Sequence, residues 1–336
     1  MNNIREFFAQ EATVVTGSPD NPSTYLYKIN DSGLTVHRVY IDTKLGGVEK
    51  NILLFSDTHM SGFNATDAEE NNPIVAETRK RRVPGFNMEL VTRNVEKIMS
   101  HAHLFDKVIV AGDILDYLTW GGLDLINKLV YDVRPDTVIL LGNHDVTRAA
   151  GHRMKDETTL DSRVDMLRTV IKNDVYYYSE RIDGLLVIGL NNCSRRYTEY
   201  QRERLLEDIA LARRESLDII IVQHEPLCTG DERDAKLVPT LMTSEWCYNA
   251  AYNFYNGNDK IGRAGDGEVA AAVYNAITSN ADVIKAVFCG HWHNAAYTEI
   301  KAHYFADGKR CEATIPQYVS TASVYGDGYI TVITVR

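Results

Sequence analysis

The chain has 336 residues, of which 44% are hydrophobic and 24% are charged, a composition typical of a folded protein with a large core. It carries 36 Lys and Arg against 46 Asp and Glu, giving a formal net charge of -10. This acidic balance disfavours sequence-independent binding of nucleic acid, which depends on a basic surface. It does not exclude a small anionic substrate, provided that bound metal supplies the positive charge.

The cysteine pattern and the start of the chain favour a cytoplasmic protein. The five cysteines are scattered and form no C-x-x-C pair, which is more typical of reduced thiols than of a disulfide framework or a structural zinc site. The first residues lack the apolar segment of a signal peptide, and no stretch has about 18 uninterrupted apolar residues. We therefore expect neither export nor membrane insertion.

The N-terminal part, residues 1–49, is expected to be an extension packed on the main domain. It contains two runs with strand-like composition, Tyr25–Ile29 and Leu34–Ile41, on either side of a turn at Asn30–Gly33. This pattern predicts a β-hairpin.

The main domain, residues 50–336, begins with alternating strands and helices. Short apolar runs predict strands at 51–55, 107–111 and 137–141, and apolar residues at helical spacing predict helices at about 90–103 and 123–131. This alternation predicts a parallel sheet with helices packed on it. In such sheets ligands bind at the carboxyl ends of the strands.

The second half of the domain repeats this logic with wider spacing. We expect strands at 175–179, 185–190, 219–222, 284–288 and 329–335, and helices at 200–214 and 268–277. Two long polar segments, at about 60–87 and 227–267, are interpreted as insertions.

Ligand-type side chains follow five of the predicted strands. They are Asp57 and His59, Asp113 and Asp116, Asn143 and His144, His224, and His291 and His293. Carboxylate, carboxamide and imidazole groups suit manganese, iron or zinc. Two neighbouring cations require a bridging anionic ligand, for which a carboxylate such as Asp113 is suitable. A water bridging two such cations becomes hydroxide near neutral pH and can attack phosphorus.

The ordered series D-x-H, G-D-x-x-D, G-N-H-D, H and G-H-x-H resembles the calcineurin-like metallophosphoesterase superfamily over about residues 50–335. Each motif alone is weak, whereas five in this order, each at a strand end, are specific. The resemblance implies an α/β fold (α+β in some schemes) in which a two-sheet β-sandwich is flanked by helices.

The resemblance also implies a role for each of these residues. One metal would be held by Asp57, His59, Asp113 and His293, and the other by Asp113, Asn143, His224 and His291. His144 would protonate the leaving group or stabilise charge on the phosphoryl group, and Asp116 would orient His144. It implies no role for Asp145.

Departures from subfamily patterns narrow the choice. Purple acid phosphatases carry a metal-binding tyrosine where this chain has Asp116, and Tyr117 is one position too late. Eukaryotic-type protein phosphatases have arginine at the position of Tyr117 and glutamate at that of Asp145. Pyrophosphatases of the lipid A pathway have arginine in place of His144. All three branches are therefore disfavoured.

The expected function is hydrolysis of a small phosphomonoester or phosphodiester by a metal-bridging hydroxide, with two divalent metal ions as cofactors. A nuclease of the same superfamily and a non-catalytic binding scaffold are the alternatives. A scaffold would typically lack a ligand or His144, and here neither is missing. The basic run Arg79–Arg82 could contact a substrate phosphate but is more typical of a solvated surface. The sequence leaves the substrate, the native metal and the oligomeric state open.

Overall fold

The computed structural model describes residues 4–9, 11–12, 28–30, 32–67, 88–147, 160–193, 197–227, 266–293, 295–323 and 328–336. Most of the two predicted insertions, at 60–87 and 227–267, lies outside these residues, as does the basic run Arg79–Arg82. The described part of the first insertion, 60–67, lies against the start of helix α4 (Trp120–Ile126). Its Met60 is fully buried and forms an isolated bridge with Leu115.

The first sheet has seven strands in the order β1-β2-β3-β13-β4-β5-β6. These strands are β1 (Glu11–Ala12), β2 (Lys28–Asn30), β3 (Thr35–Ile41), β4 (Lys50–Phe55), β5 (Lys107–Ala111), β6 (Val138–Leu140) and β13 (Tyr329–Val335). β4, β5 and β6 run parallel, as the alternating pattern predicted. β2 and β3 pair antiparallel where the sequence predicted a hairpin.

The second sheet has six strands in the order β11-β12-β10-β9-β8-β7. They are β7 (Tyr177–Ile182), β8 (Leu185–Leu190), β9 (Asp218–Gln223), β10 (Ile284–Cys289), β11 (Ala296–Ala306) and β12 (Lys309–Val319). The four central strands are parallel, and the edge strands β7 and β11 are antiparallel to their neighbours.

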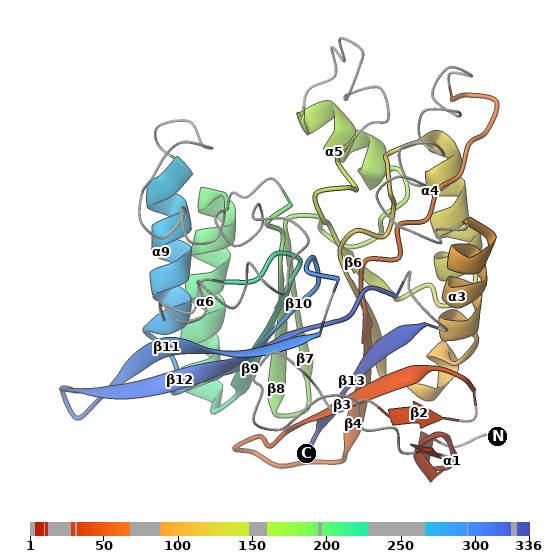
Figure 1. Cartoon of the computed structure of the whole chain (residues 1–336). Coiled ribbons are helices and arrows are strands. Elements are labelled where there is room, and N and C mark those ends of the chain that lie inside the picture. The colour runs from red at the N-terminus through yellow and green to blue at the C-terminus, as the bar shows by residue number, and fades with distance from the viewer. Residues whose placement is uncertain are drawn as a thin grey trace.

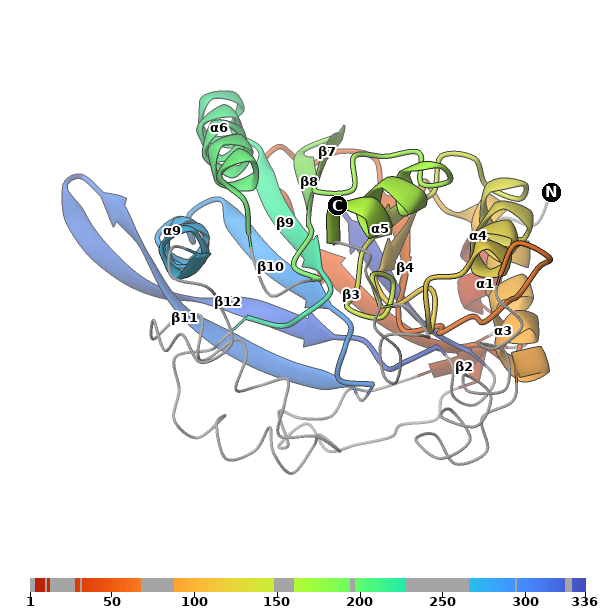
Figure 2. The ribbon, with the colours of Figure 1, turned by 90° about the horizontal axis from the view of Figure 1, so that it is seen from above.

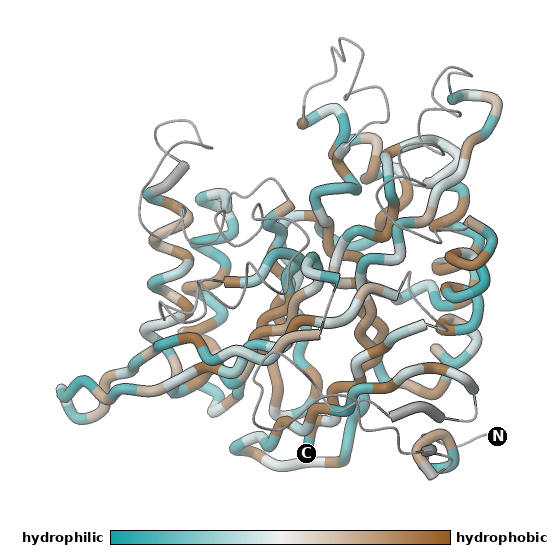
Figure 3. The backbone as a smooth tube through the Cα atoms, viewed as in Figure 1, coloured by the Kyte–Doolittle hydropathy of each residue, from teal (hydrophilic) through white to brown (hydrophobic). Residues whose placement is uncertain are grey.

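The two sheets pack face to face, with helices on both outer faces (Figures 1 and 2). α3 (Met88–Ser100) and α4 (Trp120–Ile126) cover the first sheet, and α6 (Glu199–Glu215) and α9 (Asp266–Thr278) cover the second. In β4, Ile52 and Leu54 contribute to the core between the sheets, whereas Leu53 and Phe55 contribute to the core under the helices. Burial on both faces explains why the central strands of the two sheets are mostly apolar, as the hydropathy colouring shows (Figure 3). The predicted fold class, a two-sheet α/β sandwich flanked by helices, is confirmed.

Shorter helical elements complete the described chain. They are α1 (Ile4–Ala9), a 3-10 turn at Ala102–Leu104, a π-helical turn at Asn127–Tyr131 and α5 (Leu160–Arg168). No helix among the described residues is long and apolar enough to cross a membrane.

The long β11–β12 hairpin is the main element that the sequence patterns did not predict. In β11 the buried positions hold small residues, Ala296, Thr298 and Ala302, around one large residue, Ile300, so the hydrophobic alternation of this strand is weak. A stronger signal was present at the turn, since Asp-Gly is the typical sequence of a two-residue hairpin loop. Asp307 and Gly308 have the positive φ values of such a turn, 51° and 73°.

Helix α6 is anchored to the second sheet through its first turn. Thr198 and Gln201 form a capping box. Gln201 is also buried, and its Nε2 donates to the carbonyls of Tyr176 (2.9 Å) and Asn191 (2.7 Å), at the ends of β7 and β8. This one side chain therefore fixes the start of the helix and the strand ends beneath it.

We expect Gln201→Ala to lower the free energy of unfolding by about 2–3 kcal/mol, because it removes the acceptor of the Thr198 N–H in the capping box and leaves two buried carbonyls unpaired. Denaturant unfolding followed by circular dichroism measures this change. Glu207→Ala, on the exposed side of the same helix, is the control and should change stability by less than about 0.5 kcal/mol. Equal losses in the two variants would contradict this role of Gln201.

Candidate metal centre

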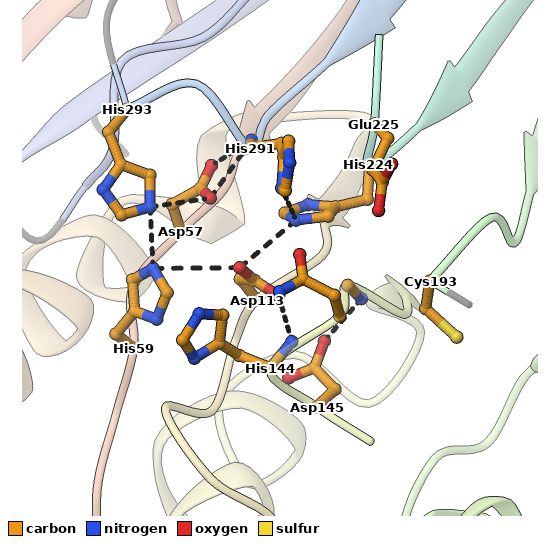
Figure 4. A network of polar contacts seen from close by, with 12 residues as sticks. Asp57, His59, Asp113, His144, Asp145, Cys193, His224, Glu225, His291 and His293 are labelled. Carbon is orange, nitrogen blue, oxygen red and sulfur yellow. Dashed lines mark hydrogen bonds and ion pairs between the residues drawn. The ribbon is translucent and has the colours of Figure 1, made fainter. Parts of the chain in front are cut away.

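The carboxyl ends of β4, β5 and β6 meet those of β9 and β10 at one end of the sandwich. Figure 4 shows the side chains that these strand ends present to one another. Three groups of metal-ligand type lie there, of which one is His59, Asp116 and His144, and Asp113 belongs to the other two. Asp57, His59, Asp113 and His293 form one group, and Asp113, His224 and His291 form the other, with all ligand atoms of each group within 4.8 Å of one another.

Asp113 lies between imidazoles from the two sheets. Its Oδ2 is 3.2 Å from His224 Nε2 and 3.9 Å from His59 Nε2. Its Oδ1 accepts a hydrogen bond from the backbone N–H of His144 at 2.8 Å. The carboxylate therefore joins β5 to β4, to the loop after β6 and to the end of β9.

The other distances complete two compact groups of donors. His293 Nε2 lies 2.9 Å from His59 Nε2 and 3.3 Å from Asp57 Oδ1. His291 Nδ1 lies 3.1 Å from His224 Nε2. Ligands about 2.1 Å from a common cation are about 3.0–3.4 Å apart in octahedral or tetrahedral geometry, so these spacings suit metal coordination.

The backbone at this edge is held in an uncommon conformation. Five of the candidate ligands have positive φ values between 50° and 73°, namely Asp57, His59, Asp113, His291 and His293. This left-handed region is unfavourable for residues other than glycine, and its occurrence at functional sites is a recognised use of strain. The strand ladders below the site fix these turns, so the side chains converge instead of following the strands outward.

Two glycines of the motifs make room for the ligands. A Cβ at Gly142 would lie 2.1 Å from Asp113 Oδ1, and a Cβ at Gly290 would lie 2.5 Å from Asp57 Oδ2. Any side chain at these positions would displace a carboxylate of the group. Close approach of backbone and ligand thus explains why glycine precedes Asn143 and His291.

Mutual charge compensation sets the pKa values of these buried groups. Burial alone would raise the pKa of Asp57, but the hydrogen bond and charge of His293 outweigh it and lower the pKa to about 2. Burial likewise opposes ionisation of His224, yet the Asp113 carboxylate raises the pKa of His224 to about 10. Burial and the neighbouring His224 lower the pKa of His291. The site therefore holds buried carboxylates that need positive charge beside them.

One further buried atom fits a cation. Within the part of the chain that the structure describes, Asn143 Oδ1 has no hydrogen-bond partner. A buried carboxamide oxygen without a donor is costly unless something else compensates it. An oxygen ligand is what a divalent manganese, iron or zinc ion accepts, so the donor set fits such ions.

His144 and Asp116 form a pair beside the two groups that share Asp113. His144 Nδ1 lies 2.9 Å from the backbone carbonyl of Asp116 and 3.2 Å from its carboxylate Oδ1. The same Oδ1 is 3.6 Å from Nδ1 of His59. Asp116 is fully buried, whereas 20% of the His144 side chain is exposed, so a molecule outside can reach this imidazole.

Asp145, for which the sequence suggested no role, braces two of the loops. Its Oδ1 accepts from the backbone N–H of Leu115 at 2.8 Å, and its Oδ2 accepts from that of Gly142 at 2.7 Å. The side chain is fully buried. Burial and the nearby Asp113 charge raise the pKa of Asp145 to about 7. Its carboxylate thus ties the loop after β5 to the loop after β6.

A family model described as calcineurin-like phosphoesterase matches residues 50–295, and the chain belongs to this family. The members of this family are metal-dependent phosphoesterases, and the groups of candidate metal ligands in this chain are consistent with that class. A comparison with curated protein sequences found no match.

Solved structures with a similar fold were also found. A dimetal phosphatase from Danio rerio is 11% identical with a TM-score of 0.46, covering 81% of this chain and 87% of that one. The purple acid phosphatase PPD1 from yellow lupin (Lupinus luteus) seeds is 14% identical with a TM-score of 0.40. The matched region covers 91% of this chain and 48% of the lupin chain.

We expect Gly290→Ala to weaken divalent metal binding by at least about tenfold, because the added methyl group would push the Asp57 carboxylate out of the group. Titration with manganese, followed by calorimetry, measures this effect. Gly184→Ala, where an added Cβ would crowd the side chains of Thr43 and Leu45 and no candidate ligand, is the control for the general cost of replacing glycine. Metal affinity equal to that of the wild type in Gly290→Ala would contradict the close packing inferred here.

We expect Asp145→Asn to lower the free energy of unfolding by about 1–3 kcal/mol, because an amide can accept only one of the two N–H donors and turns its own NH2 toward the other. Chemical denaturation measures the loss. Asp132→Asn, at an exposed position after the π-helical turn, is the matched control. An Asp145→Asn protein as stable as the wild type would show that the two loops hold without this brace.

Proposed function

We propose that the protein is a dinuclear metal-dependent phosphoesterase that hydrolyses a small phosphomonoester or phosphodiester. One observation carries the proposal: side chains from four strand ends of two different sheets, those of β4, β5, β9 and β10, form two groups that share the carboxylate of Asp113. A shared carboxylate between two groups of nitrogen and oxygen donors is the arrangement that two neighbouring divalent cations require.

The residues fall into two proposed ligand sets. Asp57, His59, Asp113 and His293 would hold one cation, and Asp113, Asn143, His224 and His291 would hold the other. Manganese, iron and zinc all suit these donors. When bound, such a pair of cations activates water and neutralises the charge of a phosphoryl group.

The protein's own groups then act on the leaving side of the ester. His144 is partly exposed beside the metal groups, and its Nδ1 faces both the carbonyl and the carboxylate of Asp116. With Nδ1 donating to Asp116, the proton for the departing oxygen would come from Nε2. The buried Asp116 would stabilise the imidazolium and fix the orientation of the ring.

The metal requirement tests the proposal directly. Purified protein should contain about two divalent metals per chain by elemental analysis. Chelation should abolish hydrolysis of phosphoesters, and added manganese should restore it. A panel of aryl and alkyl monoesters, diesters and cyclic nucleotides, run with manganese, iron and zinc in turn, identifies the preferred ester. Metal-replete protein that cleaves none of them would contradict the proposal.

We expect His144→Ala to lower kcat by about 10²- to 10⁴-fold on an alkyl phosphoester, whose leaving alkoxide needs a proton. The loss should be smaller on a 4-nitrophenyl ester, because 4-nitrophenolate leaves without protonation. Steady-state kinetics on the two substrates measure this difference, with exposed His103→Ala as the control. Equal losses on both esters would argue against proton transfer by His144 and for a role in charge stabilisation.

A further inference from the structure

The backbone just beyond His224 is held by two buried side-chain amides. Asn192 donates from Nδ2 to the carbonyl of Glu225 at 2.9 Å and accepts at Oδ1 from the N–H of Glu225 at 3.0 Å. Gln317 makes the equivalent pair with Leu227, accepting from its N–H at 2.7 Å and donating to its carbonyl at 3.0 Å. Each amide thus satisfies both polar groups of one residue.

These contacts begin where the strand ladder stops. β9 ends at Gln223, whose partner in β8 is Leu190, and His224 comes directly after it. Past this point the chain remains buried, so water cannot satisfy its N–H and C=O groups. The two amides replace the missing strand partners there. They come from different elements, Asn192 from beyond the end of β8 and Gln317 from within β12.

Both amides are themselves fixed from behind. Asn192 is 6% exposed, and the preceding Asn191 carbonyl accepts from Gln201 of helix α6. Gln317 is fully buried, lies opposite Val287 of β10 and donates to Thr298 Oγ1 at 3.0 Å. The Gln201 contact holds the backbone beside Asn192, and the Thr298 contact holds the Gln317 side chain, so the segment from Glu225 to Leu227 is held at two fixed points.

His224 itself lies between the ladder and the first of these points. Its Nδ1 donates to the carbonyl of Ala111 at 2.9 Å, and its Nε2 faces Asp113 at 3.2 Å. The ring orientation is therefore set by β5 in the other sheet. The backbone position depends on the N–H of Gly290, which donates to the His224 carbonyl at 3.0 Å, and on the anchored segment from Glu225 to Leu227. We propose that Asn192 and Gln317 are positioning residues for His224. They would thereby set the affinity of the metal site that contains His224 for its cation. This inference rests on the proposed function.

The chain offers a matched control. Asn173 makes the same pair of amide bonds with Ile139, accepting from its N–H at 2.9 Å and donating to its carbonyl at 3.1 Å. Ile139 is the middle residue of β6, an edge strand of the first sheet, where it is paired with Val110 of β5 and its neighbours Val138 and Leu140 are paired with β5 as well. Removing Asn173 therefore costs the same kind of hydrogen bonds, while β6, which leads to Asn143, stays paired with β5.

The experiment compares manganese binding by Asn192→Ala, Gln317→Leu, Asn173→Ala and the wild type, each as full-length protein. Calorimetry gives the two affinities, electron paramagnetic resonance detects the spin-coupled manganese pair, and thermal unfolding without metal reports stability. We expect Asn192→Ala and Gln317→Leu to weaken one of the two sites by about 10- to 100-fold and to lose the coupled signal at manganese concentrations that saturate the wild type. The other site should stay within about threefold. Asn173→Ala should unfold at a similarly lowered temperature and keep both affinities.

Three results would contradict the inference. Wild-type affinities in both Asn192→Ala and Gln317→Leu would overturn it and leave the proposed function intact. If the manganese affinities of both sites fell equally in Asn192→Ala and Gln317→Leu, and fell in Asn173→Ala as well, Asn192 and Gln317 would be general structural residues. A wild-type protein that binds fewer than two manganese ions would overturn the proposed function, and this inference with it. Should Asn192→Ala fail to fold, Gln317→Leu decides alone, since it removes the other anchor of the same segment.

Discussion

The position of the Asp113 carboxylate between the two sheets is the constraint on which the rest of the site depends. A buried carboxylate is stable only with positive charge or donors around it. Here the first sheet contributes His59, the second contributes His224, and the backbone N–H of His144 completes the surroundings. Because these groups come from three strand ends, the carboxylate can be compensated only when the sandwich has closed at this edge. The negative charge of Asp113 thus stabilises the contact between the two sheets at this edge and also favours the binding of cations there.

Strained turns and buried polar braces result from that requirement. Ladders of parallel strands would carry the chain straight past the site, so the ligand-bearing residues turn inward with positive φ values. Beyond each ladder, backbone groups remain buried without strand partners. Asp145, Asn192 and Gln317 supply those partners from the side, each pairing with two backbone groups. These side chains lie outside the metal-ligand groups, and the rigidity that they give the site is the preorganisation that catalysis requires.

Much of the fold and most of the candidate site could be predicted from the sequence, because the signals were local. An all-apolar run that ends in glycine and a ligand-type residue marks a buried strand and its exit within about ten residues. The braces could not be found in this way. Asp145 bonds to a residue 30 positions away, Asn192 to one 33 away and Gln317 to one 90 away. Their partners are backbone groups, which leave no mark in the sequence. The β11–β12 hairpin was missed for another reason, since alanine and threonine on its buried face hide its alternation.

The central claim is that one carboxylate, Asp113, is shared by two cations. Anomalous diffraction from crystals grown with manganese tests it most directly, because the signal locates each ion independently of any assay. We predict two peaks about 3.5–4 Å apart, one on each side of the Asp113 carboxylate. The first should lie among Asp57, His59 and His293, and the second among Asn143, His224 and His291. A single peak, or two peaks of which only one contacts Asp113, would contradict it.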